Sequence, residues 1–280
     1  MSGNKFRLVT RSDFDGLVCA VLLKELDMID DIKFVHPKDM QDGTIRISDN
    51  DITPNLPYVK GVYLAFDHHA SEAIRVEDEP DNHIIDPGAP SAARVVYEYY
   101  GGKEKFANVS AEMMEAVDKG DSAQYSVDEI LKPKGWVLLN YLMDARTGLG
   151  RFREFRVSNY NLMMQLIDAC RDHSVDEILA LPDVKERVNL YMEHQDKFTD
   201  QIKRCTKVHK NLAVLDLRGE KTIYAGNRFM IYALFPKTNI GELMLKYGGG
   251  GHENAGTCQV ANDQSDKVLG ELTKKITTDG

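Results

Sequence analysis

Short apolar runs alternate with helical patterns along the first hundred residues, and this alternation constrains the fold more than any other feature. Strands are predicted at residues 6–10, 32–36, 44–48, 62–66 and 82–85. Helical spacing is present at residues 16–26 and 91–100, and the second stretch ends at two glycines, which often terminate a helix. Strands that alternate with helices are typical of a parallel sheet with helices on both faces, so an α/β fold is expected.

The pattern changes twice in the rest of the chain. Residues 110–207 are nearly all helical in spacing, and residues 182–207 predict one long, charged helix. Strand patterns return at residues 212–217, 222–225 and 229–235, before a helical stretch at residues 240–247. We therefore expect a parallel-sheet domain with a helical extension (1–185), a connector helix (186–210) and a second, smaller α/β domain (211–280).

Charge and cysteine content limit the classes of function. The chain of 280 residues has a net charge of −9, which argues against a long binding track for duplex DNA. A small anionic substrate is still compatible, because metal ions can supply local positive charge. The four cysteines form no CxxC pair, as expected in a reducing compartment. No secretory signal or membrane-length apolar run is evident, so we expect a cytoplasmic protein without a membrane partner.

Acidic residues follow several of the predicted strands. Asp13 and Asp15 lie in TRSDFDG, directly after the first strand. Helix capping explains one of them, but two carboxylates in one loop repel each other unless a cation lies between them. Asp49 follows the predicted strand 44–48, where turn chemistry is the alternative explanation. Asp121 is a further candidate, and spacing alone does not choose between it and Asp118.

The sequence AFDHHA places Asp67, His68 and His69 at the end of another predicted strand. Imidazole is a common ligand of transition metals, and a neighbouring carboxylate can be a ligand or can orient the imidazole. In one parallel sheet these groups would converge at the same edge and repel each other. A pair of divalent cations would relieve that repulsion, and mostly oxygen ligands favour Mn²⁺ over structural Zn²⁺.

A glycine-rich run lies near the C-terminus. In KYGGGGHENAG, Gly249, Gly250 and Gly251 lead directly into His252. A flexible linker is the alternative, but consecutive glycines also permit a backbone path whose N–H groups surround a phosphate.

Together these motifs resemble the DHH phosphoesterase family, which includes nanoRNases, RecJ exonucleases, cyclic-dinucleotide phosphodiesterases, pyrophosphatases and exopolyphosphatases. The matching stretches are SDFDG, SDND, FDHH, the region of Asp121, IIDPGAPSAARVVYEYYG and the tail GGGGHENAG, so the likeness spans nearly the whole chain.

The resemblance implies an active site with two Mn²⁺ ions, for which Mg²⁺ could substitute. Asp13 would bind one ion and Asp15 the other, with Asp49 bridging, and His68 and Asp121 would complete the second site. Asp67 would be a ligand or would orient one, and His69 would face the scissile phosphate or support the metal centre. His252 and its glycines would hold the phosphate of the substrate.

Three positions depart from the family pattern. Val9 stands where many members have a metal-binding histidine, and Asp51 stands where a glycine is common. An arginine that precedes the glycine run in nanoRNase-type members is missing, so Lys237 or Arg228 would have to replace it.

The predicted function is hydrolysis of phosphodiester bonds in short single-stranded oligonucleotides or dinucleotides by metal-activated water. An exopolyphosphatase or pyrophosphatase is the alternative, and a nucleotide-binding regulator without activity is a third reading. The sequence leaves open whether the chain forms a homodimer.

Overall fold

The structure is a computed structural model that describes residues 5–76, 80–152, 154–209, 212–236, 250–252, 255–257 and 262–278. The chain divides into two compact units, Met1–Met192 and Glu193–Gly280. The division falls within α11 (Pro182–Cys205), which is the long charged helix that the sequence predicts.

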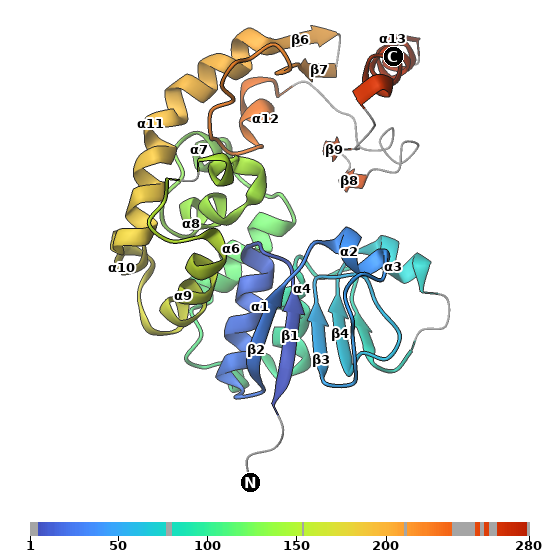
Figure 1. The fold of residues 1–280 in the computed structure, drawn as a ribbon, viewed down its shortest axis with the longest axis vertical. Coiled ribbons are helices and arrows are strands. Elements are labelled where there is room, and N and C mark those ends of the chain that lie inside the picture. Colours follow the sequence, from blue (N-terminus) through green and yellow to red (C-terminus); the bar gives the residue numbers. More distant parts are fainter. Residues whose placement is uncertain are drawn as a thin grey trace. The chain divides into compact units, whose positions relative to one another are not determined.

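A five-stranded parallel sheet forms the centre of the first unit (Figure 1). Its order is β2-β1-β3-β4-β5, and the strands are β1 (Phe6–Thr10), β2 (Ile29–Phe34), β3 (Asp51–Pro54), β4 (Leu64–Asp67) and β5 (His83–Ile85). Because all pairs are parallel, the carboxyl ends of the strands share one edge of the sheet. The predicted α/β class is confirmed.

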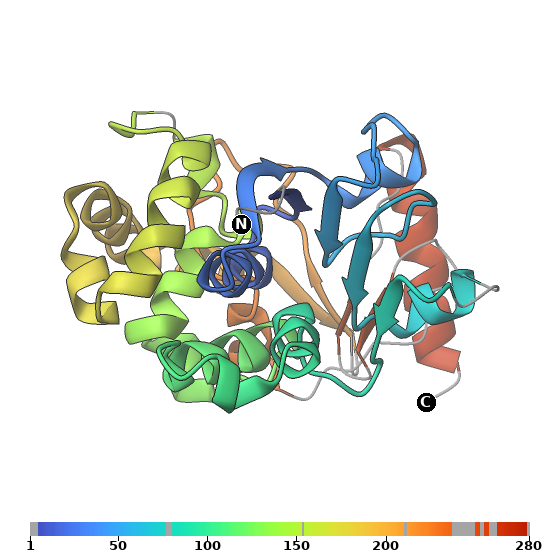
Figure 2. The same cartoon turned by 90° about the horizontal axis from the view of Figure 1, so that it is seen from below.

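Helices cover the sheet because its strands are apolar on both sides. α1 (Phe14–Glu25) and α4 (Ala92–Tyr99) pack against the strands and against each other (Figure 2). Successive strand residues point to opposite faces, and both Leu8 and Val9 are fully buried. Val9 packs with Leu56 and with Met40 of α2 (Pro37–Gln41), so this short helix helps to close one face.

One predicted strand is wrong, with consequences for the site. Residues 44–48 form no strand, and the chain enters the sheet only at Asp51. The apolar residues Ile45 and Ile47 instead pack from the loop onto the cluster around Val9. Tertiary packing thus accounts for a run that resembles a strand in the sequence.

The helical extension that the sequence predicts is present. After α3 (Ala70–Arg75) and α5 (Gly102–Lys105), the structure has α6 (Ala111–Asp121), α7 (Val127–Leu131), α8 (Gly135–Met143), α9 (Asn159–Asp172) and α10 (Val175–Ala180). α6 and α9 both contact α1, so the extension is packed onto the sheet domain.

Among its described residues, the second unit contains α11 from Glu193 onward, two antiparallel strand pairs and two further α-helices. The pairs are β6 (Thr206–His209) with β7 (Leu212–Leu215) and β8 (Gly250–His252) with β9 (Ala255–Thr257), and the helices are α12 (Met230–Leu234) and α13 (Ser265–Thr278). The predicted strand at 229–235 is wrong because α12 occupies it, and residues 222–225 are irregular. The helix expected at 240–247 lies outside the described residues.

Polar contacts hold the described part of the second unit to its own helix. Gln201 of α11 donates to Glu220 at 2.7 Å and to the carbonyl of Thr222 at 2.8 Å. Arg204 binds the same Glu220 through both terminal nitrogens, at 2.7 and 2.6 Å. These contacts fix the loop after β7 against α11.

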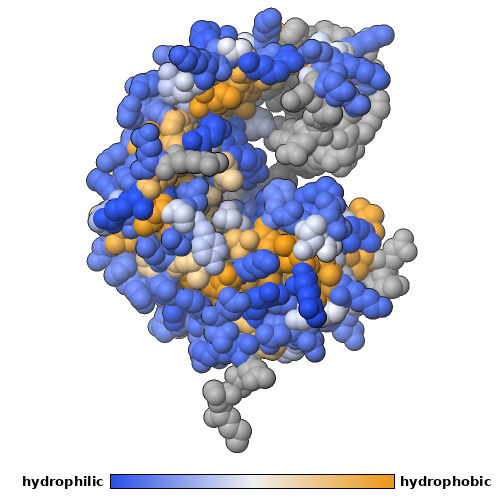
Figure 3. Space-filling model, viewed as in Figure 1, coloured by the Kyte–Doolittle hydropathy of each residue, from blue (hydrophilic) through white to orange (hydrophobic). Residues whose placement is uncertain are grey.

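Hydrophilic residues dominate the face shown in Figure 3, where hydrophobic ones appear as patches between charged ones. None of the described helices is both long enough and apolar enough to cross a membrane.

Candidate metal centre at the carboxyl edge of the sheet

The carboxylate of Asp15 is buried at the start of α1 and is held by backbone donors. The N–H groups of Ala92 and Ala93 donate to its two oxygens at 3.1 and 2.7 Å. Both groups belong to the first turn of α4, where helix N–H groups have no partner within the helix and favour negative charge. Asp15 is therefore fixed in position by a helix 77 residues further along the chain.

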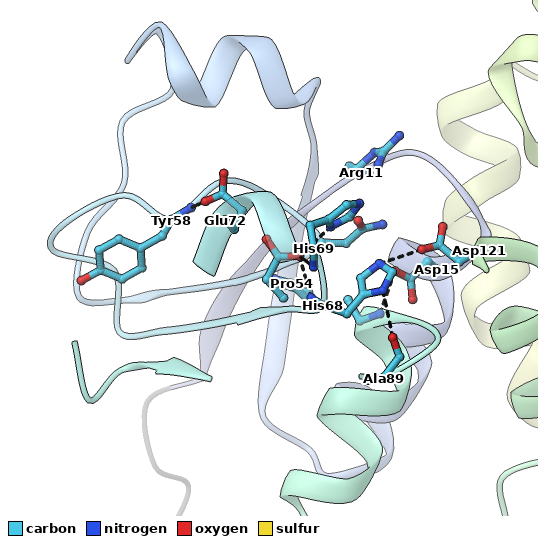
Figure 4. Close-up of polar contacts among 12 residues, drawn as sticks. Arg11, Asp15, Pro54, Tyr58, His68, His69, Glu72, Ala89 and Asp121 are labelled. Carbon is cyan, nitrogen blue, oxygen red and sulfur yellow. Dashed lines mark hydrogen bonds and ion pairs between the residues drawn. The ribbon is translucent and has the colours of Figure 1, made fainter. Parts of the chain in front are cut away.

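His68 and Asp121 face Asp15 from two other elements (Figure 4). His68 follows β4, and its Nε2 lies 2.7 Å from Oδ2 of Asp121, the last residue of α6. The Nδ1 of His68 lies 3.3 Å from the carbonyl oxygen of Ala89. Because a carbonyl can only accept, the proton of the neutral ring belongs on Nδ1, which directs the lone pair of Nε2 toward the two carboxylates.

Asp67 and His69 form a second polar group beside the first. Oδ1 of Asp67 accepts from the backbone N–H of His68 at 2.7 Å and from that of His69 at 3.1 Å. The same oxygen lies 2.7 Å from Nδ1 of His69, so the carboxylate orients this imidazole. The His69 side chain is 42% exposed, which leaves it accessible to a ligand.

Asp13 caps α1 and is surrounded by nitrogen donors. Its Oδ1 accepts from the N–H of Gly16 at 3.0 Å and from Nδ2 of Asn55 at 3.3 Å. Nε of Arg11 lies 3.1 Å from Oδ2. Gly16 is required at this turn, because a Cβ there would lie 2.2 Å from the carbonyl oxygen of Arg11.

Burial and neighbouring charges together shift the pKa values of these groups. Burial, followed by the charge of Asp121, raises the pKa of Asp15 to about 8. Burial lowers the pKa of His68, but its hydrogen bond to Asp121 and the charges of Asp121 and Asp15 outweigh this effect and raise it to about 9. Burial also raises the pKa of Asp13, although Arg11 opposes that shift.

These side chains fit a divalent cation. The ligand atoms of Asp15, His68 and Asp121 all lie within 4.8 Å of one another. The pKa values of Asp15 and His68 are raised, whereas for Asp121 the effect of burial is outweighed by contact with His68, which lowers its pKa, as expected for a crowded cluster of carboxylates around one imidazole without a cation. Two carboxylates and one imidazole are suitable ligands for Mn²⁺ and similar ions.

Asp49 is not brought to this site. It lies in an exposed turn before β3, and therefore at the amino edge of the sheet. Asp51 does not add charge to the site either, because its carboxylate binds Arg7 at 2.6 and 2.9 Å at that same edge. Both residues lie at the amino edge because residues 44–48 form a loop, so Asp49 precedes the strand β3 and Asp51 begins it. The residue that directly follows the carboxyl end of β3 is Asn55.

The structure also separates Asp118 from Asp121. Oδ1 of Asp118 accepts from Oγ of Ser91 at 2.7 Å, and Oδ2 accepts from Nε of Arg94 at 3.0 Å. Asp118 therefore ties α6 to the first turn of α4, while Asp121 is the residue that faces His68 and Asp15.

The predicted phosphate-binding residues belong to the second unit. Gly250, Gly251 and His252 form β8, whereas Gly249 and Lys237 lie outside the described residues. Arg228 lies in the turn before α12, with its Cζ 4.1 Å from the ring centre of Phe229.

Sequence reasoning missed Arg11, Asn55 and the N–H groups of Ala92 and Ala93. Arg11 directly follows the correctly predicted first strand, so its position already pointed to the site edge. Asn55 would have been found if the strand had been placed at DITP rather than at residues 44–48. The backbone donors required knowledge of which helix packs beside α1.

Comparison with known proteins identifies a solved structure that is closely similar over the whole chain. A solved structure described as the pGpG-specific phosphodiesterase PggH from Vibrio cholerae is 57% identical, covers 99% of this chain and 100% of its own, and superposes with a TM-score of 0.82. The chain belongs to the family of this phosphodiesterase. The prediction of a phosphoesterase, a hydrolytic enzyme, is confirmed at that level.

The remaining comparisons give no further information about the family or the function. An uncharacterized protein from Helicobacter pylori G27 is 13% identical over 99% of both chains, with a TM-score of only 0.36. No protein-family model matches the chain, and no curated protein matches it.

Proposed function

We propose that the chain hydrolyses the phosphodiester bond of dinucleotides or very short oligonucleotides, with pGpG as the first substrate to test. The observation that carries this proposal is the Asp15, His68 and Asp121 cluster, found in a chain 57% identical to a pGpG-specific phosphodiesterase. We further propose that this family is part of the DHH phosphoesterases, as the FDHH sequence of residues 66–69 suggests.

Asp15, His68 and Asp121 would hold a divalent cation, for which we propose Mn²⁺. When bound, such an ion lowers the pKa of a water and stabilises charge on phosphate oxygens. The N–H groups of Ala92 and Ala93 keep the Asp15 carboxylate in place for this role. The contact of His68 with the Ala89 carbonyl orients its Nε2 in the same way.

His69 is suited to act on the substrate directly. Burial lowers its pKa, but the hydrogen bond to Asp67 outweighs this effect, so the net shift is upward. A protonated imidazole at this position would donate to a phosphoryl oxygen or give its proton to the leaving oxygen. Asp67 would stabilise the imidazolium throughout.

Product analysis tests the proposal. Purified protein is incubated with Mn²⁺ and either pGpG or polyphosphate, and the products are separated by anion-exchange chromatography. We expect GMP from pGpG and no orthophosphate from polyphosphate, with Asp15→Asn as the inactive control. Release of orthophosphate alone, or no turnover of pGpG, would contradict the proposal.

A further inference from the structure

Asp13 is bound by nitrogen donors on both of its oxygens. Gly16 and Asn55 donate to Oδ1, and Arg11 lies against Oδ2 at 3.1 Å. A carboxylate that ligates a dication needs an oxygen turned toward that ion. Here the oxygen not used for capping is turned toward a guanidinium.

Within the described residues, the two positions that the family pattern would use to complete a dication site around Asp13 supply no ligand there. Val9 is fully buried in an apolar cluster, and Asp49 lies at the other edge of the sheet. The carboxyl end of β3 presents the neutral amide of Asn55, whose nitrogen faces Asp13. Asn55 Oδ1 is buried and has no hydrogen-bond partner among the described residues, but one neutral oxygen is a weak substitute for a carboxylate.

Two groups of potential metal ligands are present in the described part of the chain, and neither supports a dication site at Asp13. One is Asp15, His68 and Asp121, and the other is Asp67, His68 and His69, so neither includes Asp13. The second group shares His68 with the first, and its Asp67 already accepts from two backbone N–H groups and from His69.

Arg11 provides positive charge at this place instead. The charge of Asp13 raises the pKa of Arg11 against the effect of burial, and Asp121, Asp15 and Asp144 act in the same direction. The side chain is 29% exposed and lies on the same side of the site as Asp121, whose charge acts on it (Figure 4). A guanidinium presents several donors in one plane, a geometry that matches phosphate oxygens.

We propose that the guanidinium of Arg11 takes the place of a second cation, so that the centre binds one dication at Asp15, His68 and Asp121. Arg11 would contact the phosphate of the substrate while Asp13 holds it in position. This inference rests on the proposed function for the role of Arg11 in turnover, but the number of bound ions can be measured without any substrate.

The first experiment counts Mn²⁺ per chain by isothermal titration calorimetry and by elemental analysis after gel filtration. We expect one ion per wild-type chain. Asp13→Asn should still bind one ion with a similar Kd, whereas Asp15→Asn should bind none. Two tightly bound ions in the wild-type protein, or loss of the ion in Asp13→Asn, would overturn the inference.

The second experiment removes the guanidinium. Arg11→Ala should lower kcat/KM for pGpG by about 100-fold, as loss of a group that stabilises transition-state charge does, while binding of the single Mn²⁺ persists. Added guanidinium ions should restore part of the activity. Arg171→Ala is the matched control, because Arg171 is 32% exposed and also pairs with a carboxylate, Glu25, at 3.2 Å.

The outcomes separate the two proposals. Full activity in Arg11→Ala would refute the role of Arg11. An inactive wild-type protein would refute the proposed function, but the Mn²⁺ count of Asp13→Asn and Asp15→Asn would still decide the number of ions. Circular dichroism of each variant shows whether it has folded.

Discussion

Among individual residues, Asp15 and Asp49 have similar sequence surroundings but very different positions in the structure. Asp15 is buried among the donors of α4, whereas Asp49 is exposed at the opposite edge of the sheet. Asp15→Asn should reduce turnover by about 100-fold or more, because even residues that only orient metal ligands contribute 10- to 100-fold. Asp49→Asn should keep activity within about twofold of wild type, since exposed substitutions rarely perturb a fold. Steady-state kinetics on both variants tests the contrast, and equal losses would contradict it.

Metal binding should release protons near neutral pH. The pKa of Asp15 is raised to about 8 and that of His68 to about 9, so both groups hold a proton at pH 7 when no cation is present. A cation requires the carboxylate and the neutral imidazole, so its apparent affinity should increase as the pH rises from 6 to 9. Calorimetric titration of Mn²⁺ in two buffers of different ionisation enthalpy measures the release. An enthalpy independent of the buffer would contradict this prediction.

The same shifts give the metal-free protein a distinctive pH dependence of stability. Both folded-state pKa values lie above the unfolded ones, so the folded state binds protons more tightly. The stability that these protons confer is therefore lost gradually as the pH rises, from 3.8 to about 8 for Asp15 and from 6.5 to about 9 for His68. Thermal unfolding with and without Mn²⁺ should diverge most at the alkaline end of this range.

At the scale of elements, Asp118 connects two helices that carry parts of the site. It binds Ser91 and Arg94 of the α4 N-terminus, while Asp121 lies one turn further along α6. Asp118→Asn should destabilise the fold by about 1–3 kcal/mol, the usual range for hydrogen bonds to charged groups. It should also weaken Mn²⁺ binding about tenfold, because the carboxylates of Asp15 and Asp121 would be less well aligned.

Glu98→Gln is the control for this helix contact. Glu98 also pairs with Arg94, at 3.2 Å, but its side chain is 63% exposed, so little change is expected. Chemical denaturation gives the stability and calorimetry gives the Mn²⁺ affinity. If Asp118→Asn loses stability but keeps its Mn²⁺ affinity, its role is structural only.

Some helices and strands could be predicted from the sequence pattern alone, and others could not. Strand β1 and the acidic residues after it could be predicted, because the apolar strand pattern, the glycine turn and the carboxylates all occur within a few residues. The run around Ile45 was misread because its apolar side chains pack from a loop rather than from a strand. Likewise, residues 230–234 have strand-like composition but form a helix that packs near Thr199 of α11. The local sequence pattern does not determine which part of the fold an apolar segment will pack against.

For the whole molecule, the sequence motif around His252 predicts a role in substrate binding rather than in metal binding. The proposed metal ligands Asp15, His68 and Asp121 all belong to the first unit, and His252 belongs to the second. His252→Ala should therefore raise KM for pGpG and leave Mn²⁺ affinity unchanged. Kinetics and calorimetry on the same preparation test this. A variant that no longer binds Mn²⁺ would show that the assignment to substrate is wrong.

The burial of Val9 has an evolutionary consequence for the chemistry of this enzyme. Its side chain is part of the cluster with Met40 and Leu56, so a histidine introduced there would place a polar ring among apolar neighbours. Such a change costs about 1–3 kcal/mol unless the ring finds a hydrogen-bond partner. A descendant that acquired another ion would have to rebuild this packing as well as release Asp13 from Arg11. Dependence on an arginine would thus be difficult to reverse in single mutational steps.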